Sequence, residues 1–278
     1  QSMSLAEKVG QLIVTHKHKY GEDLIDEFHV GGVCFLGNDL KAADIVATVN
    51  RLQEYAPQPL WFAIDAEAGM GSRITDATIF PIFMAFGATG DVELARECGR
   101  ITAREASALG IHVAYGPTVD VNTDLHNPAV STRSCSDNPD LAIAMSKAFC
   151  EGARSQGALT TLKHYPGQGH THSDSHRDLP VSDVSRDEME RIHLRPFQEL
   201  AADGLADAVM TAHLWYPAYH PETPWPATLS RTFNEDILRR QFGFEGVLIS
   251  DAFNMAGIVS AIPHEPERAA RIDFAFHR

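Results

Sequence analysis

The chain has 278 residues, of which 44% are hydrophobic and 22% are charged, and its formal net charge at pH 7 is −14. These proportions are typical of a globular protein and argue against global disorder. The acidic balance argues against nucleic acid or an anionic membrane surface as a partner, because both require a basic protein surface.

Short apolar runs alternate along the chain with longer amphipathic stretches. Seven of these runs are rich in β-forming residues and apolar on both faces, as the strands of a buried parallel sheet are. In chain order, the predicted strands are Gly10–Thr15, Val30–Leu36, Leu60–Ile64, His112–Tyr115, Leu159–His164, Ala208–Ala212 and Gly246–Ser250. The predicted helices are Ala42–Tyr55, Asp91–Leu109, Pro139–Gln156, Arg186–Ala202, Asn234–Gln241 and Pro266–His277.

Strand, loop and helix repeated seven times predict an α/β fold with a parallel sheet. Polar residues just after the strands favour a (β/α)8 barrel of the TIM type, in which ligands bind at that end. A doubly wound open sheet is the alternative, but no GxGxxG motif follows a strand. The chain stops at Arg278 without a pattern for an eighth strand, so we expect an irregular barrel or a chain that lacks the last strand. Without a Pro- or Gly-rich linker, residues 1–278 are predicted to form a single domain.

No apolar stretch approaches the roughly 18 residues of a membrane span, and no basic segment followed by an apolar one opens the chain at Gln1. We therefore expect a cytoplasmic protein, with a secreted or periplasmic location after removal of a leader as the alternative. Four cysteines occur singly, without a CxxC pair, which predicts small buried hydrophobes rather than a zinc or disulfide framework.

The segment from Lys163 to Pro180 contains more residues able to act in catalysis or ligand binding than any other segment of the sequence. Lys163 and His164 fall at the tip of the fifth predicted strand, where they can reach a ligand. Asp174 and His176 occupy alternate positions and therefore point the same way in an extended segment. A carboxylate–imidazole pair of this kind holds one histidine tautomer and suits a general acid/base near neutral pH.

Two other interpretations of this segment stay open. It can be a solvated polar loop in which the histidines have no chemical role. It can also be a metal site, because His170, His172, Asp174 and His176 are all possible ligands. Against the metal site, the His-x-His pair lies six residues beyond the strand tip.

Three further segments place polar residues after predicted strands. Asp251 directly follows the seventh strand, where it can be a nucleophile facing the pocket or the N-cap of the next helix. Asp65, after the third strand, can accept hydrogen bonds from hydroxyl groups. We expect Glu67 and Arg73 to form an ion pair with each other. Arg133 can clamp a ligand or brace its own loop.

These segments together resemble glycoside hydrolase family 3, in particular its bacterial β-N-acetylglucosaminidases of the NagZ type. The resemblance covers nearly the whole chain and begins with an opening helix at Ser4-Leu-Ala-Glu-Lys-Val-Gly-Gln-Leu. The most specific motif is Lys163-His-Tyr-Pro-Gly-x-Gly followed by Asp174-Ser-His-x-x-Leu-Pro. The other matching motifs are Asp65-x-Glu, Asn127-Pro-x-x-x-x-Arg-Ser, Met210-Thr-Ala-His-x-x-Tyr-Pro-Ala, Pro226-Ala-Thr-Leu-Ser and Ser250-Asp-x-x-x-Met.

The resemblance implies a role for each matching residue. Asp251 would be the nucleophile that forms a glycosyl-enzyme intermediate. His176 would be the acid/base, with Asp174 as its orienting partner. The residues implied to bind the sugar in the innermost subsite are Asp65, Arg133, Lys163 and His164, with His213 as a further wall residue. Neither a metal nor another cofactor is expected.

The implied function is that of a retaining exo-β-N-acetylglucosaminidase acting on terminal N-acetyl-β-glucosaminides from cell wall, peptidoglycan or chitin. The alternatives are a family 3 β-glucosidase, a β-N-acetylglucosaminide phosphorylase, a non-catalytic sugar-binding barrel and a metal-dependent hydrolase. Phosphorolysis is included because a neutral histidine repels incoming phosphate less than a glutamate would. The sequence departs from the subgroup at Gln168, where a histidine is usual, and at Ala252, which replaces a second acid. His170 and His172 also make the loop unusually rich in histidine.

Overall fold

The computed structural model describes residues 3–16 and 22–261. Within these residues, seven strands form one sheet in which every neighbouring pair is parallel and the order follows the chain. The strands are β1 (Val14–His16), β2 (Gly32–Phe35), β3 (Trp61–Ile64), β4 (Val113–Ala114), β5 (Leu159–Tyr165), β6 (Ala208–Thr211) and β7 (Val247–Ser250). The predicted α/β fold with a parallel sheet is confirmed.

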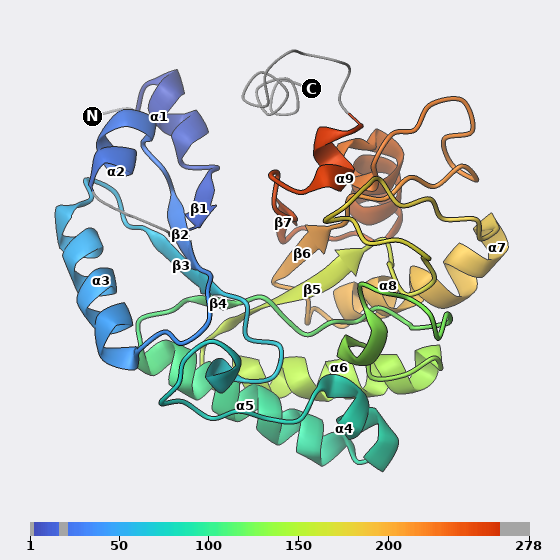
Figure 1. Ribbon diagram of the computed structural model, residues 1–278, viewed down its shortest axis with the longest axis horizontal. Helices are drawn as coiled ribbons and strands as arrows, with labels where there is room; N and C mark the ends of the chain where they lie inside the picture. The colour runs from blue at the N-terminus through green and yellow to red at the C-terminus, as the bar shows by residue number, and fades with distance from the viewer. Residues whose placement is uncertain (1–2, 17–21, 262–278) are drawn as a thin grey trace.

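Helices connect the strands and pack outside the sheet (Figure 1). The α-helices are α1 (Leu5–Gly10), α2 (Asp23–Phe28), α3 (Ala42–Tyr55), α4 (Phe83–Thr89), α5 (Val92–Ala108), α6 (Pro139–Arg154), α7 (Arg186–Glu188), α8 (Arg195–Ala202) and α9 (Ala256–Val259). Short 3-10 turns are η1 (Met70–Ser72), η2 (Ser131–Arg133) and η4 (Ala227–Leu229). Two segments are π-helical, η3 (Met189–His193) and η5 (Thr232–Gln241).

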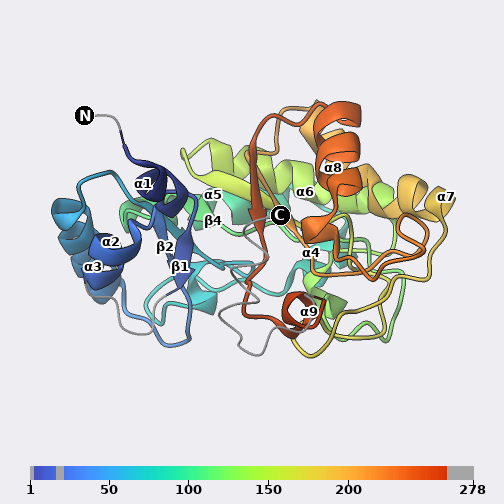
Figure 2. The same ribbon diagram turned by 90° about the horizontal axis from the view of Figure 1, so that it is seen from above.

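The sheet curls into a half-barrel of the TIM type, with β1 and β7 at its two edges (Figure 1). Figures 1 and 2 both place α1–α3 at one end of the molecule and α7 at the other. An eighth strand does not occur in residues 3–16 and 22–261. The helix predicted over Pro266–His277 lies outside the described residues. No helix among those described is long and apolar enough to cross a bilayer.

Local sequence signals explain several element boundaries. Ser4 and Glu7 form a reciprocal capping box at the start of α1, which satisfies N–H groups that the first turn leaves without partners. Asn138 caps α6, and Pro139 follows at a position where its missing N–H costs nothing. The helix α3 spans the predicted range Ala42–Tyr55.

Two predicted elements had the wrong boundaries. The first strand was expected from Gly10, but Gly10 ends α1, where a Cβ would lie 2.2 Å from the Phe28 carbonyl oxygen. The expected single helix Arg186–Ala202 is interrupted by the π-helical η3 and restarts at Arg195. Pro196 has no N–H to continue the ladder, so a regular helix cannot run through this point.

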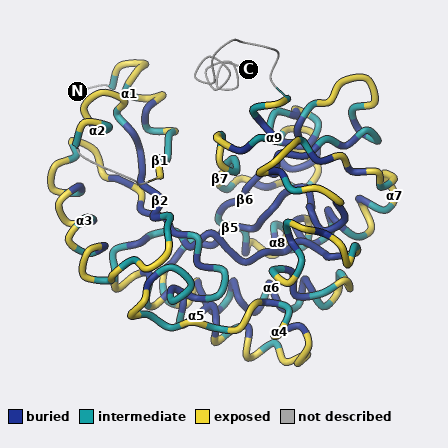
Figure 3. Tube along the Cα trace, in the orientation of Figure 1, coloured by how far each residue is buried: buried dark blue, intermediate teal, exposed yellow. Residues whose placement is uncertain are grey.

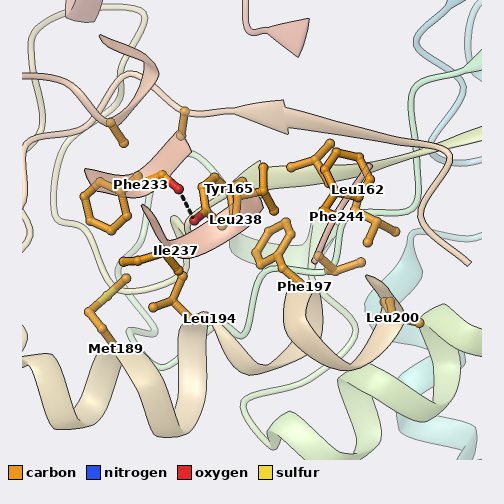
Figure 4. Packing of buried hydrophobic residues seen from close by; sticks show 14 of the residues in the cluster. Leu162, Tyr165, Met189, Leu194, Phe197, Leu200, Phe233, Ile237, Leu238 and Phe244 are labelled. Carbon is orange, nitrogen blue, oxygen red and sulfur yellow. Dashed lines mark hydrogen bonds between the residues drawn. The ribbon is translucent and has the colours of Figure 1, made fainter. Parts of the chain in front are cut away.

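The largest hydrophobic cluster lies between the second half of the sheet and its outer helices (Figure 4). Tyr165 from β5 packs edge-on against Phe197 of α8 and Phe233 of η5, with ring centroids 5.2 and 6.3 Å apart. The Tyr165 hydroxyl donates to the Phe233 carbonyl oxygen at 2.8 Å, so the buried polar atom is satisfied. The central strands β2, β5 and β6 are buried, whereas the outer surface of α3 is exposed (Figure 3). All four cysteines are buried and free, as predicted.

Candidate active site

A cavity of about 670 Å³ opens inside the curled sheet and over the carboxyl ends of its strands. Its wall combines residues of both edge strands with the loops that follow β3, β4, β5 and β7. Seven predicted site residues line it together: Asp65, Arg133, Lys163, His164, Asp174, His176 and Asp251. Residues far apart in the sequence are therefore gathered at one place by the parallel topology.

The floor of the cavity centres on the buried ammonium of Lys163. Its Nζ lies 2.6 Å from Asp65 Oδ1 and 2.5 Å from Glu67 Oε1. Burial alone would lower the pKa of Lys163, but the two carboxylates raise it above its ordinary value. The ammonium therefore stays charged and holds Asp65 at the cavity wall.

The prediction that Glu67 pairs with Arg73 is wrong. Arg73 donates to Asp65 Oδ2 at 2.8 Å, while Glu67 receives two bonds from Arg133, at 2.6 and 2.8 Å. Burial would raise the pKa of Glu67, but the charges of Lys163 and Arg133 lower it well below its ordinary value. Glu67 does not itself line the cavity, so its role is to orient the two cations that do.

Arg133 braces its loop, as one of the two predictions has it, and also lines the cavity; its role as a ligand clamp stays a prediction. Its Nη1 donates to the Ala129 carbonyl oxygen at 2.9 Å, and its Nη2 lies 3.1 Å from Nε2 of His164. The loop that carries it is shaped by Asn127, whose side-chain oxygen accepts from the N–H groups of Ala129 and Val130. This arrangement fixes the guanidinium at the base of the cavity.

Asp120 is a functional residue that the sequence patterns did not single out. It is fully buried after β4, and its Oδ2 accepts from the backbone N–H of His164 at 3.0 Å and lies 2.7 Å from the ring Nδ1. Its Oδ1 accepts from the Gln168 N–H at 2.7 Å. Asp120 thus orients the His164 ring and the turn that follows it. An aspartate in the loop that follows the fourth predicted strand was the available signal.

Asp251 lies at the end of β7, with its Oδ1 accepting from the Ala252 N–H at 2.7 Å. Burial raises its pKa, but the imidazoles of His164 and His213 and the Ala252 N–H lower it more, so the pKa lies below its ordinary value. The carboxylate is therefore ionised at neutral pH. The N-cap of the following helix α9 is Met255, so Asp251 does not serve as that cap.

His213 lies behind this segment instead of on the cavity wall. It is fully buried, with Nδ1 2.7 Å from the Thr228 hydroxyl and Nε2 3.2 Å from the Ala252 carbonyl oxygen. Burial lowers its pKa. Its contacts support the backbone that follows Asp251, and the role of wall residue stays a prediction.

Asp174 and His176 form the predicted carboxylate–imidazole pair. Asp174 Oδ1 accepts from the His176 backbone N–H at 2.9 Å and lies 2.8 Å from the ring Nδ1. Burial raises the pKa of Asp174, but these two bonds lower it more, so its pKa is below its ordinary value. The His176 side chain is 69% exposed, which leaves its Nε2 free to meet a ligand or solvent.

The other two histidines of this loop turn away from the pair. His170 is buried with Nε2 2.6 Å from the Ser182 hydroxyl, and His172 is exposed with Nδ1 2.7 Å from Asp124. Among the described residues, no group of three or more His, Cys, Asp or Glu side chains is arranged to hold a metal ion. The four candidate ligands of the metal interpretation therefore do not converge.

Comparison with known proteins agrees with the motif resemblance. A family model described as the glycosyl hydrolase family 3 N terminal domain matches residues 4–272. The chain belongs to glycoside hydrolase family 3. A β-hexosaminidase A from Pseudoalteromonas piscicida is 37% identical over 257 residues, which are 85% of this chain and 43% of that protein.

Two solved structures share the fold. A family 3 β-N-acetylglucosaminidase from Paenibacillus sp. str. FPU-7 matches with a TM-score of 0.90 at 36% identity, covering 99% of this chain and 54% of that one. The β-glucoside phosphorylase BglX matches with a TM-score of 0.88 at 32% identity, covering 94% and 48%. The chain thus spans about half the length of these three similar proteins.

Proposed function

We propose that this chain carries the catalytic domain of a retaining exo-β-N-acetylglucosaminidase. The observation that carries the proposal is that an ionised carboxylate, Asp251, and the Asp174–His176 pair line the same cavity from different strands. Retaining hydrolysis requires a nucleophile and a separate acid/base at one sugar-binding site. The family membership and the names of the relatives agree with this chemistry.

The reaction would proceed in two displacements. Asp251 attacks the anomeric carbon and forms a glycosyl ester, while His176 donates a proton to the departing glycosidic oxygen. His176 then takes a proton from water as that water attacks the ester, which releases the sugar with its original configuration. Asp174 accepts the Nδ1–H of His176 and stabilises the imidazolium form.

The charged floor would bind the sugar ring. Asp65 offers carboxylate oxygens to hydroxyl groups, and Lys163 and Arg133 offer donors. Because Glu67 holds Lys163 and Arg133 from behind and Asp120 holds His164, the floor is preorganised before substrate arrives. Terminal N-acetyl-β-glucosaminides, from cell wall or chitin, are the proposed substrates, since relatives named as β-hexosaminidase and β-N-acetylglucosaminidase are among the matches.

Replacement of Asp251 tests the proposal. We expect Asp251→Ala to abolish release of the chromogenic group from an aryl N-acetyl-β-glucosaminide, while Asp187→Ala, a change at a 90% exposed carboxylate on α7, leaves it unchanged. A mechanism-based 2-fluoro sugar should label the wild-type peptide that contains Asp251. Undiminished activity of Asp251→Ala, or a label on another peptide, would overturn the assignment.

Phosphorolysis is the second candidate, favoured by an imidazole in place of a carboxylate at the acid/base position and by the likeness to a β-glucoside phosphorylase. An incoming phosphate dianion is repelled less by a neutral imidazole than by a carboxylate. A sugar 1-phosphate formed on addition of inorganic phosphate would favour this candidate. Rates on gluco- and N-acetylgluco-substrates separate the β-glucosidase alternative in the same assay.

A further inference from the structure

The proposed acid/base lies on a loop, residues 171–181, that leaves the sheet after β5 and returns before α7. His176 pairs with Asp174 only two residues away, so that pair moves with the loop and does not fix its position. At the apex, the loop is tied by a bond from the Gly257 N–H to the Ser175 carbonyl oxygen, at 2.8 Å. The place of His176 over the cavity therefore also depends on how the two feet of the loop are held.

The first foot of the loop, at Gln168–His170, is anchored to the loop that follows β4. Asp120 accepts from the Gln168 N–H, and the Asn127 side chain donates to the Gln168 carbonyl oxygen, each at 2.7 Å. Gly169 lies so close to Val121 that a Cβ would be 1.9 Å from its carbonyl oxygen. This foot is therefore rigid with respect to the floor of the cavity.

The second foot, at Pro180–Ser182, is anchored to a different segment. The Ser182 N–H donates to the Trp215 carbonyl oxygen at 2.8 Å, and the Trp215 N–H donates to the Pro180 carbonyl oxygen at 2.9 Å. Trp215 follows β6, whereas the first foot is attached to the loop after β4. These backbone contacts do not set the spacing between the two feet, although the Tyr216 hydroxyl, next to Trp215, donates to the Gly167 carbonyl oxygen at 2.7 Å.

A side-chain contact bridges that spacing. His170 Nε2 lies 2.6 Å from the Ser182 hydroxyl, and the two residues are only 8% and 1% exposed. The His170 ring also packs on His193, with centroids 4.2 Å apart, where the π-helical η3 ends. Gly167 allows this approach, since a Cβ there would lie 2.8 Å from Cβ of His193.

The protonation of the bridge follows from its surroundings. Burial lowers the pKa of His170 to about 4 and that of His193 to about 2, so both rings are neutral at pH 7. His170 Nδ1 has no hydrogen-bond partner among the described residues. A buried N–H without an acceptor is costly, so the proton belongs on Nε2 and the Ser182 oxygen accepts it.

We propose that His170 is a positioning residue. Its hydrogen bond to Ser182, here called the clasp, joins the two feet of the 171–181 loop and thereby holds His176 over the cavity. The role in turnover rests on the proposed glycosidase function, whereas the clasp itself is a property of the fold. His170 acts through the loop and does not line the cavity. Removal of the clasp should therefore weaken acid catalysis without removing the nucleophile or the sugar-binding floor.

Two substrates with different leaving groups test the role in turnover. For His170→Phe and Ser182→Ala, we expect turnover of methyl N-acetyl-β-glucosaminide to fall about tenfold, the equivalent of one lost buried hydrogen bond. The kcat/KM value for a nitrophenyl N-acetyl-β-glucosaminide, which covers only the steps up to departure of a leaving group that needs no proton, should stay within about twofold. The control His193→Leu removes a ring that contacts His170 but no bond of the clasp, and should leave the ratio of the two rates unchanged.

The rate of trypsin cleavage after the exposed Arg177 reports how firmly the loop is held and does not require enzymatic activity. We expect His170→Phe and Ser182→Ala to be nicked there about tenfold faster than wild type, measured at a temperature well below the unfolding transition of each variant. Equal losses on both substrates, or wild-type nicking rates in both variants, would overturn the proposal. If His170→Phe does not fold, Ser182→Ala decides. If wild type cleaves neither substrate, the proposed function fails while the nicking rates still test the clasp.

Discussion

The acid/base proposed for this site is an imidazole, and its charge is stabilised by a carboxylate only two residues away. Loss of this imidazole should matter most for substrates whose leaving group must be protonated as it departs. We expect His176→Ala to slow an alkyl N-acetyl-β-glucosaminide by about 100-fold or more and a nitrophenyl one much less. The measurement is the ratio of kcat/KM values for the two substrates.

The matched control for this prediction is His126→Ala, a change at a histidine whose side chain is 92% exposed on the loop after β4. It should leave both rates at their wild-type values. An equal loss on the two substrates in His176→Ala would mean that the histidine binds sugar and does not transfer a proton.

Seven of the eight site residues proposed from sequence line one cavity, because each lies at the end of a strand or in a loop at the carboxyl edge of the sheet. Their partners could not be predicted in the same way. Glu67 pairs with Arg133 and Lys163, which come from other strands, so no local spacing reveals the pairs. Sequence spacing predicts which edge a residue occupies, whereas the ion pairs depend on how the strands curl.

At the scale of elements, long periodic segments were the most predictable. The helices α3, α5 and α6 begin and end within two residues of their predicted bounds, because each has a regular apolar face and α5 and α6 also have side-chain N-caps. The division of residues 186–202 into α7, η3 and α8 could not be predicted from the sequence. The apolar period of these residues continues through the π-helical η3, where the Leu194 N–H donates to the Met189 carbonyl oxygen five residues earlier.

The loop after β5 depends on a close approach that only glycine permits. A Cβ at Gly169 would lie 1.9 Å from the Val121 carbonyl oxygen, so Gly169→Ala must push the first foot away from the β4 loop. We expect the change to lower the free energy of unfolding by about 1–3 kcal/mol, as overpacking does, and to slow the alkyl substrate more than the nitrophenyl one. Denaturant unfolding and the two-substrate assay measure these effects.

Gly116→Ala is the control for this glycine, since a Cβ there meets no atom within 4 Å. It should change neither the stability nor the ratio of rates by a comparable amount. Wild-type stability and rates in Gly169→Ala would show that the two loops are not held at this point.

At the scale of the whole molecule, two buried histidines should make the fold sensitive to acid. Burial lowers the pKa of His170 to about 4 and of His193 to about 2, and His193 has no hydrogen-bond partner among the described residues. The pKa of His170 is raised by the charges of three nearby carboxylates and lowered by that of His172, and the pKa of His193 is lowered by His170. The carboxylates are Asp120, Asp183 and Asp124. These charges do not offset burial, so the pKa of each histidine stays below its ordinary value.

The sign of the effect follows from proton binding. The pKa of a histidine in the unfolded chain is about 6.5. Below that pH, the unfolded chain binds protons that the folded protein does not bind, so the free energy of unfolding falls as pH drops. The loss continues to about pH 4 for His170 and about pH 2 for His193. Each histidine should remove about 1.4 kcal/mol per pH unit within its window. The carboxylates of Glu67 and Asp251, whose pKa values are lowered, lose their contribution only in more acidic solution.

His193→Leu isolates the contribution of one histidine to this acid sensitivity. Between pH 6.5 and pH 5, the variant should lose about 1.6 kcal/mol less unfolding free energy than wild type. Urea unfolding at a series of pH values measures both slopes. The variant should also be the more stable protein at pH 5, because leucine leaves no buried nitrogen without a partner. Parallel slopes in the two proteins would mean that His193 is protonated to the same extent in the folded and unfolded states, and that its burial costs the fold nothing in acid.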